Sequence, residues 1–250
     1  MADSVALAWR QYRLERRMFW RNPAAAFFNF ALPLLLLVLL GTLYSDDQGN
    51  LDVLVPGIAG MAIVSTTFVA LAHNLVFLRE QGVLKRLRGT PMPTGAYLTG
   101  MFGNAVANAA IQLAIVIVAG RVFYGIGWPE HWPELVVFAV AGVVCFAALG
   151  VAFSHVIPNF EATPAYVNAV FLPLIFISGV FYDAEQAPAF LRDIAQALPL
   201  VHLIDGLSGA MVTGASLADN LSNLAVIALW AAFGIVFAIR GFSWEARREA

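Results

Sequence analysis

Charged residues are scarce in this sequence. Only 14 of the 250 residues are Lys or Arg and 16 are Asp or Glu, so that 12% of the chain is charged, against about 25% of an ordinary soluble domain. Hydrophobic residues make up 60%, which is more than the interior of a soluble chain of this length can bury. The composition therefore excludes a soluble enzyme, a disordered chain and a typical nucleic-acid-binding protein, and it predicts that lipid is the main solvent.

The residues of common catalytic and metal sites are also missing. Lys85 is the single lysine and lies between Leu84 and Arg86, so the chain has no Gly-Lys-Ser/Thr of a nucleotide-binding P-loop. The 4 histidines are far apart, and none stands in a His-Glu-x-x-His pattern. The one cysteine, Cys145, cannot form an internal disulfide. We therefore expect no catalytic site, no metal and no cofactor within this chain.

Long hydrophobic runs are what the sequence has in abundance. Six runs of 20 to 32 residues contain no charged residue, and a helix needs about 20 apolar residues to cross a bilayer. The runs are apolar on all sides rather than alternating, which excludes the strands of a barrel. The sequence predicts an all-α, polytopic membrane protein in one transmembrane domain over 1–250, with six transmembrane helices at about 24–44, 53–78, 94–119, 135–157, 164–182 and 221–240.

The basic residues are distributed unevenly around these six spans. Twelve of the 14 lie before the first span, between the second and third, or after the sixth. Because basic loops stay in the cytoplasm, we predict a multi-pass protein of the cell (inner) membrane with both termini cytoplasmic. Apart from Arg240 at the end of the sixth, the spans contain no Asp, Glu, Lys or Arg, which argues against a proton-driven carrier.

Residues 5–21 are predicted to form an amphipathic helix on the membrane surface. One face carries apolar and aromatic side chains, namely Val5, Ala8, Trp9, Tyr12, Phe19 and Trp20. A stripe of arginines lies beside it, namely Arg10, Arg13, Arg17 and Arg21, and Asn22-Pro23 ends the helix. A positive anchor that sets the topology and a helix that contacts a partner both account for this pattern.

The segment 79–91 is a short basic loop after the second span. Its sequence predicts a compact helix with Val83, Leu84 and Leu87 on one side, ended by Gly89-Thr90-Pro91. Lys85, Arg86 and Arg88 point elsewhere. The residues fit a docking surface for a partner, and they equally fit a positive loop that only enforces topology.

Two further segments are unusual for a simple bundle. Residues 183–220 should lie outside, yet Phe190, Ile194 and Leu198 share an apolar face between two prolines, and the following apolar piece is too short to cross. We predict re-entrant exofacial helices there, with an ordinary lipid-lying loop as the alternative. On span three, the polar side chains of Asn104, Asn108 and Gln112 are four residues apart and form one stripe. The stripe either packs against neighbouring helices or lines a substrate path.

Together these features resemble the membrane subunits (permeases) of ABC-2-type exporters, and the resemblance covers nearly the whole chain. It rests on the lead-in at 5–21, the six spans, the segment 79–91 followed by Tyr97, and the span-five sequence 171–182 with 198–205 after it. Its most specific part is the spacing of six residues in the basic loop: Glu80, Gly82, Leu84, Leu87, Arg88 and Pro91. In outline the chain is most similar to the short permeases of drug and antibiotic exporters.

The resemblance implies roles and partners. The lead-in would be a connecting helix, and 79–91 would be a coupling helix that seats in a groove of a separate ATP-binding subunit. The residues implied in coupling are Glu80, Gly82, Val83, Leu84, Arg86, Leu87, Arg88 and Pro91. A homodimer in membrane lipid is implied, with two copies of a soluble ATP-binding cassette subunit beneath it, ATP and Mg on those subunits, and no nucleic acid. ATP-driven closure would rearrange spans one, two and five.

The implied function is export of an amphipathic or hydrophobic substrate, such as a drug, an antibiotic or a lipid-like molecule, from the cytoplasm or the inner leaflet. Export of a polysaccharide or glycolipid by the same kind of permease is the first alternative. A passive channel or scaffold, which would use the basic loop only for topology, is the alternative from another class.

Overall fold

The computed structural model describes residues 2–44, 48–89, 93–182 and 187–241, and within these ranges the chain is helical and contains no strand. The predicted all-α class is therefore confirmed. Two π-helical turns, η1 (Ser65–Val69) and η3 (Gly209–Thr213), interrupt or extend α-helices. The α-helices in chain order are α1 (Ala2–Arg21), α2 (Pro23–Leu43), α3 (Gln48–Val64), α4 (Ala70–Glu80), α5 (Val83–Arg88), α6 (Thr94–Tyr124), α7 (Trp132–Ser154), α8 (Thr163–Ile177), α9 (Ala189–Ala197), α10 (Pro199–Ser208) and α11 (Leu221–Gly241).

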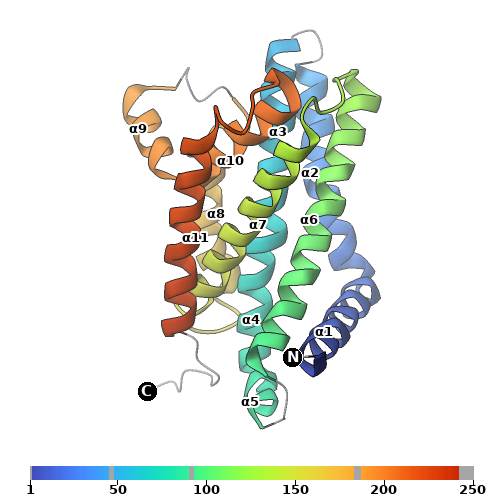
Figure 1. The fold of residues 1–250 in the computed structure, drawn as a ribbon, viewed down its shortest axis with the longest axis vertical. Coiled ribbons are helices and arrows are strands. Elements are labelled where there is room, and N and C mark those ends of the chain that lie inside the picture. Colours follow the sequence, from blue (N-terminus) through green and yellow to red (C-terminus); the bar gives the residue numbers. More distant parts are fainter. Residues whose placement is uncertain (1, 45–47, 90–92, 183–186, 242–250) are drawn as a thin grey trace.

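The long helices stand side by side, and the short helices α5 and α9 lie at opposite ends of the bundle (Figure 1). The N-terminal part of α1, the helix α5 and the C-terminal end of α11 lie at one end, and α9 lies at the other. Lys85 and Arg86 belong to α5 and Arg240 lies in the last turn of α11, so we call this end of the bundle the basic end. The clustering of basic residues that the sequence predicted is thus present in space.

Four helical stretches are long and apolar enough to cross a membrane, namely Gly49–Glu80, Gly95–Tyr124, Trp132–Ser154 and Leu221–Arg240. The pair Ala189–Ala197 and Pro199–Thr213, bent by 90°, makes a fifth if it counts as one span. The apolar helices Asn29–Leu43 and Thr163–Ile177 are shorter. Helix length in the described residues therefore supports four or five spans, and the count of six stays a prediction.

The segment between α8 and α11 forms a corner of two helices. Leu198 has an extended backbone and Pro199 opens α10, which is why the chain turns sharply between α9 and α10. α9 buries only Ala195, whereas α10 is inserted against α3, α7 and α11 with Leu200, Leu203 and Leu207 fully buried. A broken span and a re-entrant loop both fit this corner, so the predicted re-entrant fold of 183–220 stays a prediction.

The stretch from α3 to α4 contains the π-helix η1 in its middle. The hydroxyls of Ser65 and Thr66 donate to the carbonyl of Ala62, and that of Thr67 donates to Ile63 O, which satisfies carbonyls that the wide turn leaves free. α7 approaches this turn at Gly150, where an added Cβ would lie 2.7 Å from Phe68 O. Such π-turns often mark functional sites in helices, and here η1 borders the cavities described below.

Candidate coupling element and its neighbouring cavities

The helix α5 projects from the basic end beyond α4 and α6 (Figure 1). α4 ends because Gly82 adopts the left-handed backbone conformation, with φ at +65°. The Gly82 amide donates to Arg79 O at 3.1 Å, and the Gly82 carbonyl then accepts the amide of Arg86 at 3.1 Å to start α5. A side chain at this position would be strained, so the predicted importance of Gly82 has a backbone cause.

The side chains of α5 divide between the interior and the surface. Leu84 is only 2% exposed and packs with Leu78 of α4 and with Tyr97 and Met101 of α6. Val83 is half-buried, and Lys85 and Arg86 are exposed. The prediction that Leu84 is an outward-facing contact residue does not agree with this burial, because the turn at Gly82 folds α5 back so that Leu84 fills the space between α4 and α6.

Part of the predicted coupling set cannot be placed. The side chains of Leu87 and Arg88 and the whole of Pro91 lie outside the residues that the structure describes. Their assignment to a partner surface stays a prediction.

Arg79 and Glu80 bind the connection between α7 and α8. The guanidinium of Arg79 is buried and donates to Ser154 O at 3.0 Å and to Ile157 O at 2.6 Å. Glu80 Oε1 accepts the amide of Phe160 at 2.6 Å. These bonds satisfy carbonyls and an amide that the ends of helices leave open. The last turn of α4 is thereby fastened to the segment that leads into α8.

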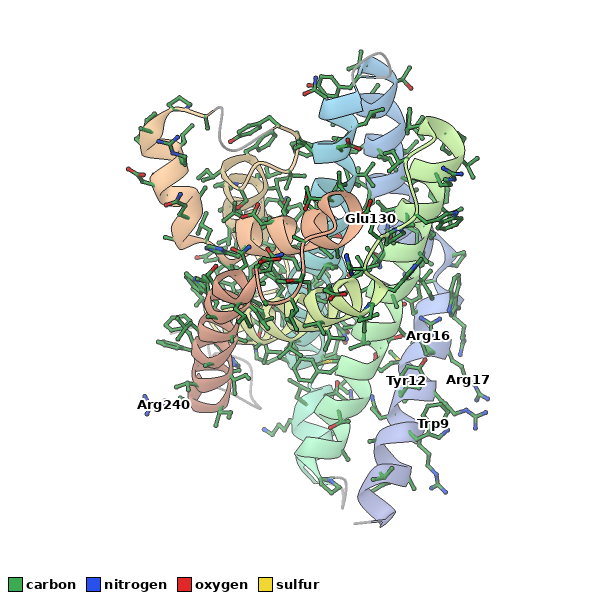
Figure 2. All side chains as sticks on the ribbon, turned by 45° about the horizontal axis from the view of Figure 1, so that its top comes forward. Trp9, Tyr12, Arg16, Arg17, Glu130 and Arg240 are labelled. Carbon is green, nitrogen blue, oxygen red and sulfur yellow. The ribbon has the colours of Figure 1, made fainter. Side chains whose placement is uncertain are left out.

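The sequence pattern of α1 did not indicate which of its residues pack against the rest of the bundle. Trp9 is 59% exposed, and Trp20, Arg13 and Arg17 are also exposed. Figure 2 shows Arg17 projecting away from the bundle. The buried positions are instead Gln11 and Glu15, and Gln11 Nε2 donates to Glu15 Oε1 at 2.8 Å.

A glycine on α6 explains this orientation of α1. An added Cβ at Gly100 would lie 2.6 Å from Gln11 Cβ and 2.9 Å from Ala8 O, so α1 fits into the notch that Gly100 leaves. Tyr12 is half-buried beside this contact and stacks on Trp9, with ring centroids 5.1 Å apart. The apolar residues predicted to form one face are therefore available to lipid, and the buried strip is polar.

The polar stripe on α6 serves more than one purpose. Asn108 Oδ1 accepts a hydrogen bond from Arg16 of α1, which is turned toward α6 in Figure 2. Gln112 Nε2 donates to Phe30 O of α2 at 3.4 Å. Asn104 Oδ1 is buried and has no partner among the described residues. Asn108 and Gln112 thus hold α1 and α2, whereas Asn104 and Asn108 border a cavity.

Two neighbouring cavities lie next to the junction of α1 and α2. The larger, about 640 Å³, opens between α2, η1, α4 and α8, and its walls include Pro33, His73, Phe160, Asn168 and Phe171. The smaller, about 240 Å³, lies between α1, α4 and α6. Phe19, Asn22, Asn29, Ala70 and Asn74 line both cavities.

Glu15 lines the smaller cavity and is 7% exposed. Burial raises the pKa of its carboxyl above the usual 4.5, and the hydrogen bond from Gln11 acts in the opposite direction. Glu15 was not predicted from the sequence, because the pattern of residues 5–21 is dominated by apolar and basic side chains. The signal that could have found it is the spacing of Gln11 and Glu15, four residues apart on one helical face.

No group of three or more His, Cys, Asp or Glu side chains that could hold a metal ion occurs in the described part of the chain. Cys145 is buried.

Comparison with known proteins agrees with the family resemblance seen in the sequence. Residues 4–212 match the family described as ABC-2 type transporter. The chain is 27% identical to Nodulation protein J of Rhizobium leguminosarum bv. viciae over 236 residues, covering 89% of this chain and 87% of that protein. It is 26% identical to Nodulation protein J of Rhizobium meliloti (strain 1021) over 224 residues, covering 85% of each.

A second kind of relative is the inner membrane transport permease YadH of Escherichia coli (strain K12). The identity is 24% over 170 residues, which is 67% of this chain. The match spans 66% of the length of YadH.

Proposed function

The chain belongs to the family of ABC-2 type transporters, and from this premise we propose that it is the transmembrane permease subunit of an ATP-driven exporter of amphipathic substrates. The basic end faces the cytoplasm in this proposal. A soluble ATP-binding subunit supplies the energy, with ATP and Mg bound on that subunit, and α5 is the coupling helix that contacts it. The exposed Lys85 and Arg86 would pair with acidic residues of the subunit.

The observation that carries this proposal is the connection between α5 and the wall of the larger cavity. α5 follows α4 through the tight turn at Gly82, and Glu80 at the end of α4 binds the amide of Phe160. The ring of Phe160 lines the 640 Å³ cavity and packs against Phe77 of α4, with centroids 5.4 Å apart. A displacement of α5 by the partner would therefore move a cavity wall and the start of α8.

The walls of the larger cavity favour an amphipathic substrate. Leu32, Met61 and Phe171 offer apolar surface, while Asn29, Asn74 and other polar residues offer hydrogen bonds. The amide side chains could equally bind sugar hydroxyls, so export of a polysaccharide or glycolipid is the second candidate. A passive channel is the rival from another class, and it requires no partner.

A second copy of this chain is part of the proposal. α8 exposes Val170, Leu172 and Phe176, and α2 exposes Leu35 and Leu39. Apolar side chains on these two helices could pack against the same helices of another copy, so that the larger cavity lies near the dimer axis. Two ATP-binding subunits would then bind beneath the pair.

The decisive experiment is charge reversal on the exposed face of α5. In a complex purified with its ATP-binding subunit, Arg86→Glu should lower permease-stimulated ATP hydrolysis and transport by about tenfold or more, because like charges across an interface cost several kcal/mol. Arg240→Glu, an exposed arginine at the same end of the bundle, is the matched control and should have little effect. Membrane insertion of both variants is checked by the yield of folded protein.

Substitution of Leu84 is not a test of docking, since this side chain is buried within the chain itself. Normal transport by Arg86→Glu would refute the coupling role of α5. Substrate passage through the purified permease in the absence of any ATP-binding subunit would establish the channel instead.

A further inference from the structure

We infer that Glu15 recognises a positively charged amino group of the substrate, so that the exporter carries amphipathic cations. This inference rests on the proposed function and specifies the class of molecule that it moves. The ammonium group would enter the smaller cavity beside Glu15, and the apolar body of the same molecule would occupy the larger cavity.

Glu15 is unusual among the side chains around both cavities. Of the described residues that line either one, it is the single residue with a formal negative charge, and none is Lys or Arg. Gln11 occupies one of its carboxylate oxygens with a hydrogen bond of 2.8 Å. The charge therefore faces a cavity of about 240 Å³ in which no described lining residue carries a compensating cation.

The rest of the smaller cavity is rich in hydrogen-bond acceptors. Asn104 Oδ1 is buried without a partner among the described residues, and Asn29 and Asn74 line the cavity from α2 and α4. An ammonium group carries only donors, so it can bind the carboxylate and Asn104 Oδ1 together. A head group that carries a phosphate or carboxylate and no amine would be rejected, since it would place a second negative charge beside Glu15 without a cation.

The two cavities together have the shape of an amphipathic molecule. They share Phe19, Asn22, Asn29, Ala70 and Asn74, so a ligand can extend from one into the other. Leu32, Pro33, Met61, Phe77 and Phe171 form apolar parts of the larger cavity. An alkyl or aromatic body gains from burial there, while the charged head stays with Glu15.

A bound cation would also relieve the cost of burying Glu15. A buried carboxylate without a partner is unfavourable, and burial raises the pKa of Glu15. An ammonium group in the cavity would favour the ionised form and so lower that pKa. The competing explanation is purely structural, with Glu15 serving only to hold Gln11 against α6.

Direct binding to the purified permease distinguishes these explanations. The probe is a dansyl-labelled alkylamine, and its N-acetylated form is the neutral counterpart. Glu15→Gln keeps an oxygen for the bond from Gln11 and removes only the charge, so it should weaken binding of the amine by about tenfold or more, as for loss of a charged pair, and leave the acetylated probe unchanged. Glu161→Gln, an exposed carboxylate outside the cavities, is the control.

A second variant acts in the opposite direction. Asn104→Asp places another carboxylate at the same cavity and should strengthen binding of the amine in the wild type and restore it in Glu15→Gln. The gain in the wild type does not depend on whether the single Glu15 variant folds well. Equal affinity of the wild type for the charged and neutral probes, or no effect of either variant, would overturn the inference.

Transport by the complex with its ATP-binding subunit separates this inference from the proposed function. The substrates are the alkylamine, its acetylated form and phosphatidylethanolamine labelled on an acyl chain, which distinguishes a free amine from a lipid headgroup as the source of the ammonium. Preference for either charged substrate supports the inference. Equal ATP-driven transport of the acetylated probe refutes it and leaves the proposed function intact. Amine binding that needs Glu15, without ATP-driven transport of any probe, refutes the proposed function and leaves the site.

Discussion

Glu15 lies in α1 with its carboxylate turned into the protein, and its ionisation should affect the stability of the whole chain. Its pKa in the folded state is raised by burial above the usual 4.5. Both states are protonated well below 4.5, and as the pH rises from there the unfolded chain loses its proton first. Stability should therefore fall with rising pH until Glu15 also ionises in the folded protein. Tyr97 on α6 interacts electrostatically with Glu15, and Arg16 follows Glu15 on the same helix.

Glu15→Gln should remove this dependence and raise the thermal midpoint at neutral pH relative to the wild type. The measurement is thermal unfolding of the detergent-solubilised protein over a range of pH from 4.5 upward. Glu161→Gln, which changes an exposed carboxylate, should leave the profile unaltered. Identical profiles for the wild type and Glu15→Gln would show that burial does not perturb Glu15.

Arg79 belongs to the basic segment 79–91, but its guanidinium is buried and binds backbone carbonyls inside the bundle. Arg79→Gln removes the bonds to Ser154 O and Ile157 O and leaves both carbonyls without their charged donor. The expected cost is about 3 kcal/mol or more, which corresponds to a fall of roughly 5–10 °C in the thermal midpoint. Arg86→Gln, at an exposed position, should change the midpoint by no more than about 1–2 °C. An equal effect of both substitutions would contradict the assigned role.

At the scale of elements, the contact between α1 and α6 depends on close approach at one glycine. Gly100→Ala would place a methyl group 2.6 Å from Gln11 Cβ, so α1 must shift away from α6. We expect a loss of about 1–3 kcal/mol together with increased cleavage of α1 by protease. Gly95→Ala is matched in helix and chemistry, and its added Cβ would have no neighbour within 4 Å. Similar protease sensitivity in the two variants would show that the notch does not hold α1.

Elements were largely predictable from the sequence, but their orientations were not. The lack of charge and the apolar runs predict helices, and the prolines place the turn near Pro199, whereas the turn at Gly82 inside the segment 79–91 was not predicted. The buried strip of α1 was not predicted, because a helix at a membrane has two apolar environments, lipid and protein, and the periodicity of Trp9, Tyr12 and Trp20 does not distinguish them. Leu84 was placed outward for the same reason, since an apolar residue on a basic loop fits a partner surface and an internal core equally well.

At the scale of the whole molecule, the described helices form a densely packed side and a sparsely packed side. α3, α7, α10 and α11 surround the main core, in which Phe138 and Phe146 are almost fully buried. α8 contacts mainly α4 and α9, and the larger cavity lies beside it. Such a division favours motion of α8 against a rigid remainder. The sequence could predict α8 as an apolar segment, but its few neighbours depend on long-range packing that no local pattern encodes.

The internal bonds of Arg79 and Glu80 limit how this segment can be exchanged when the protein is to be combined with the ATP-binding subunit of another transporter. Within one short segment, Arg79, Glu80, Gly82 and Leu84 maintain the architecture, while Lys85 and Arg86 face outward. A chimera that replaced the whole segment would exchange the surface proposed to contact the ATP-binding subunit, and it would also remove the bonds that hold α4 to the connection between α7 and α8. Replacing only the outward-facing Lys85 and Arg86 would change the surface offered to an ATP-binding subunit and would keep the internal bonds of the segment.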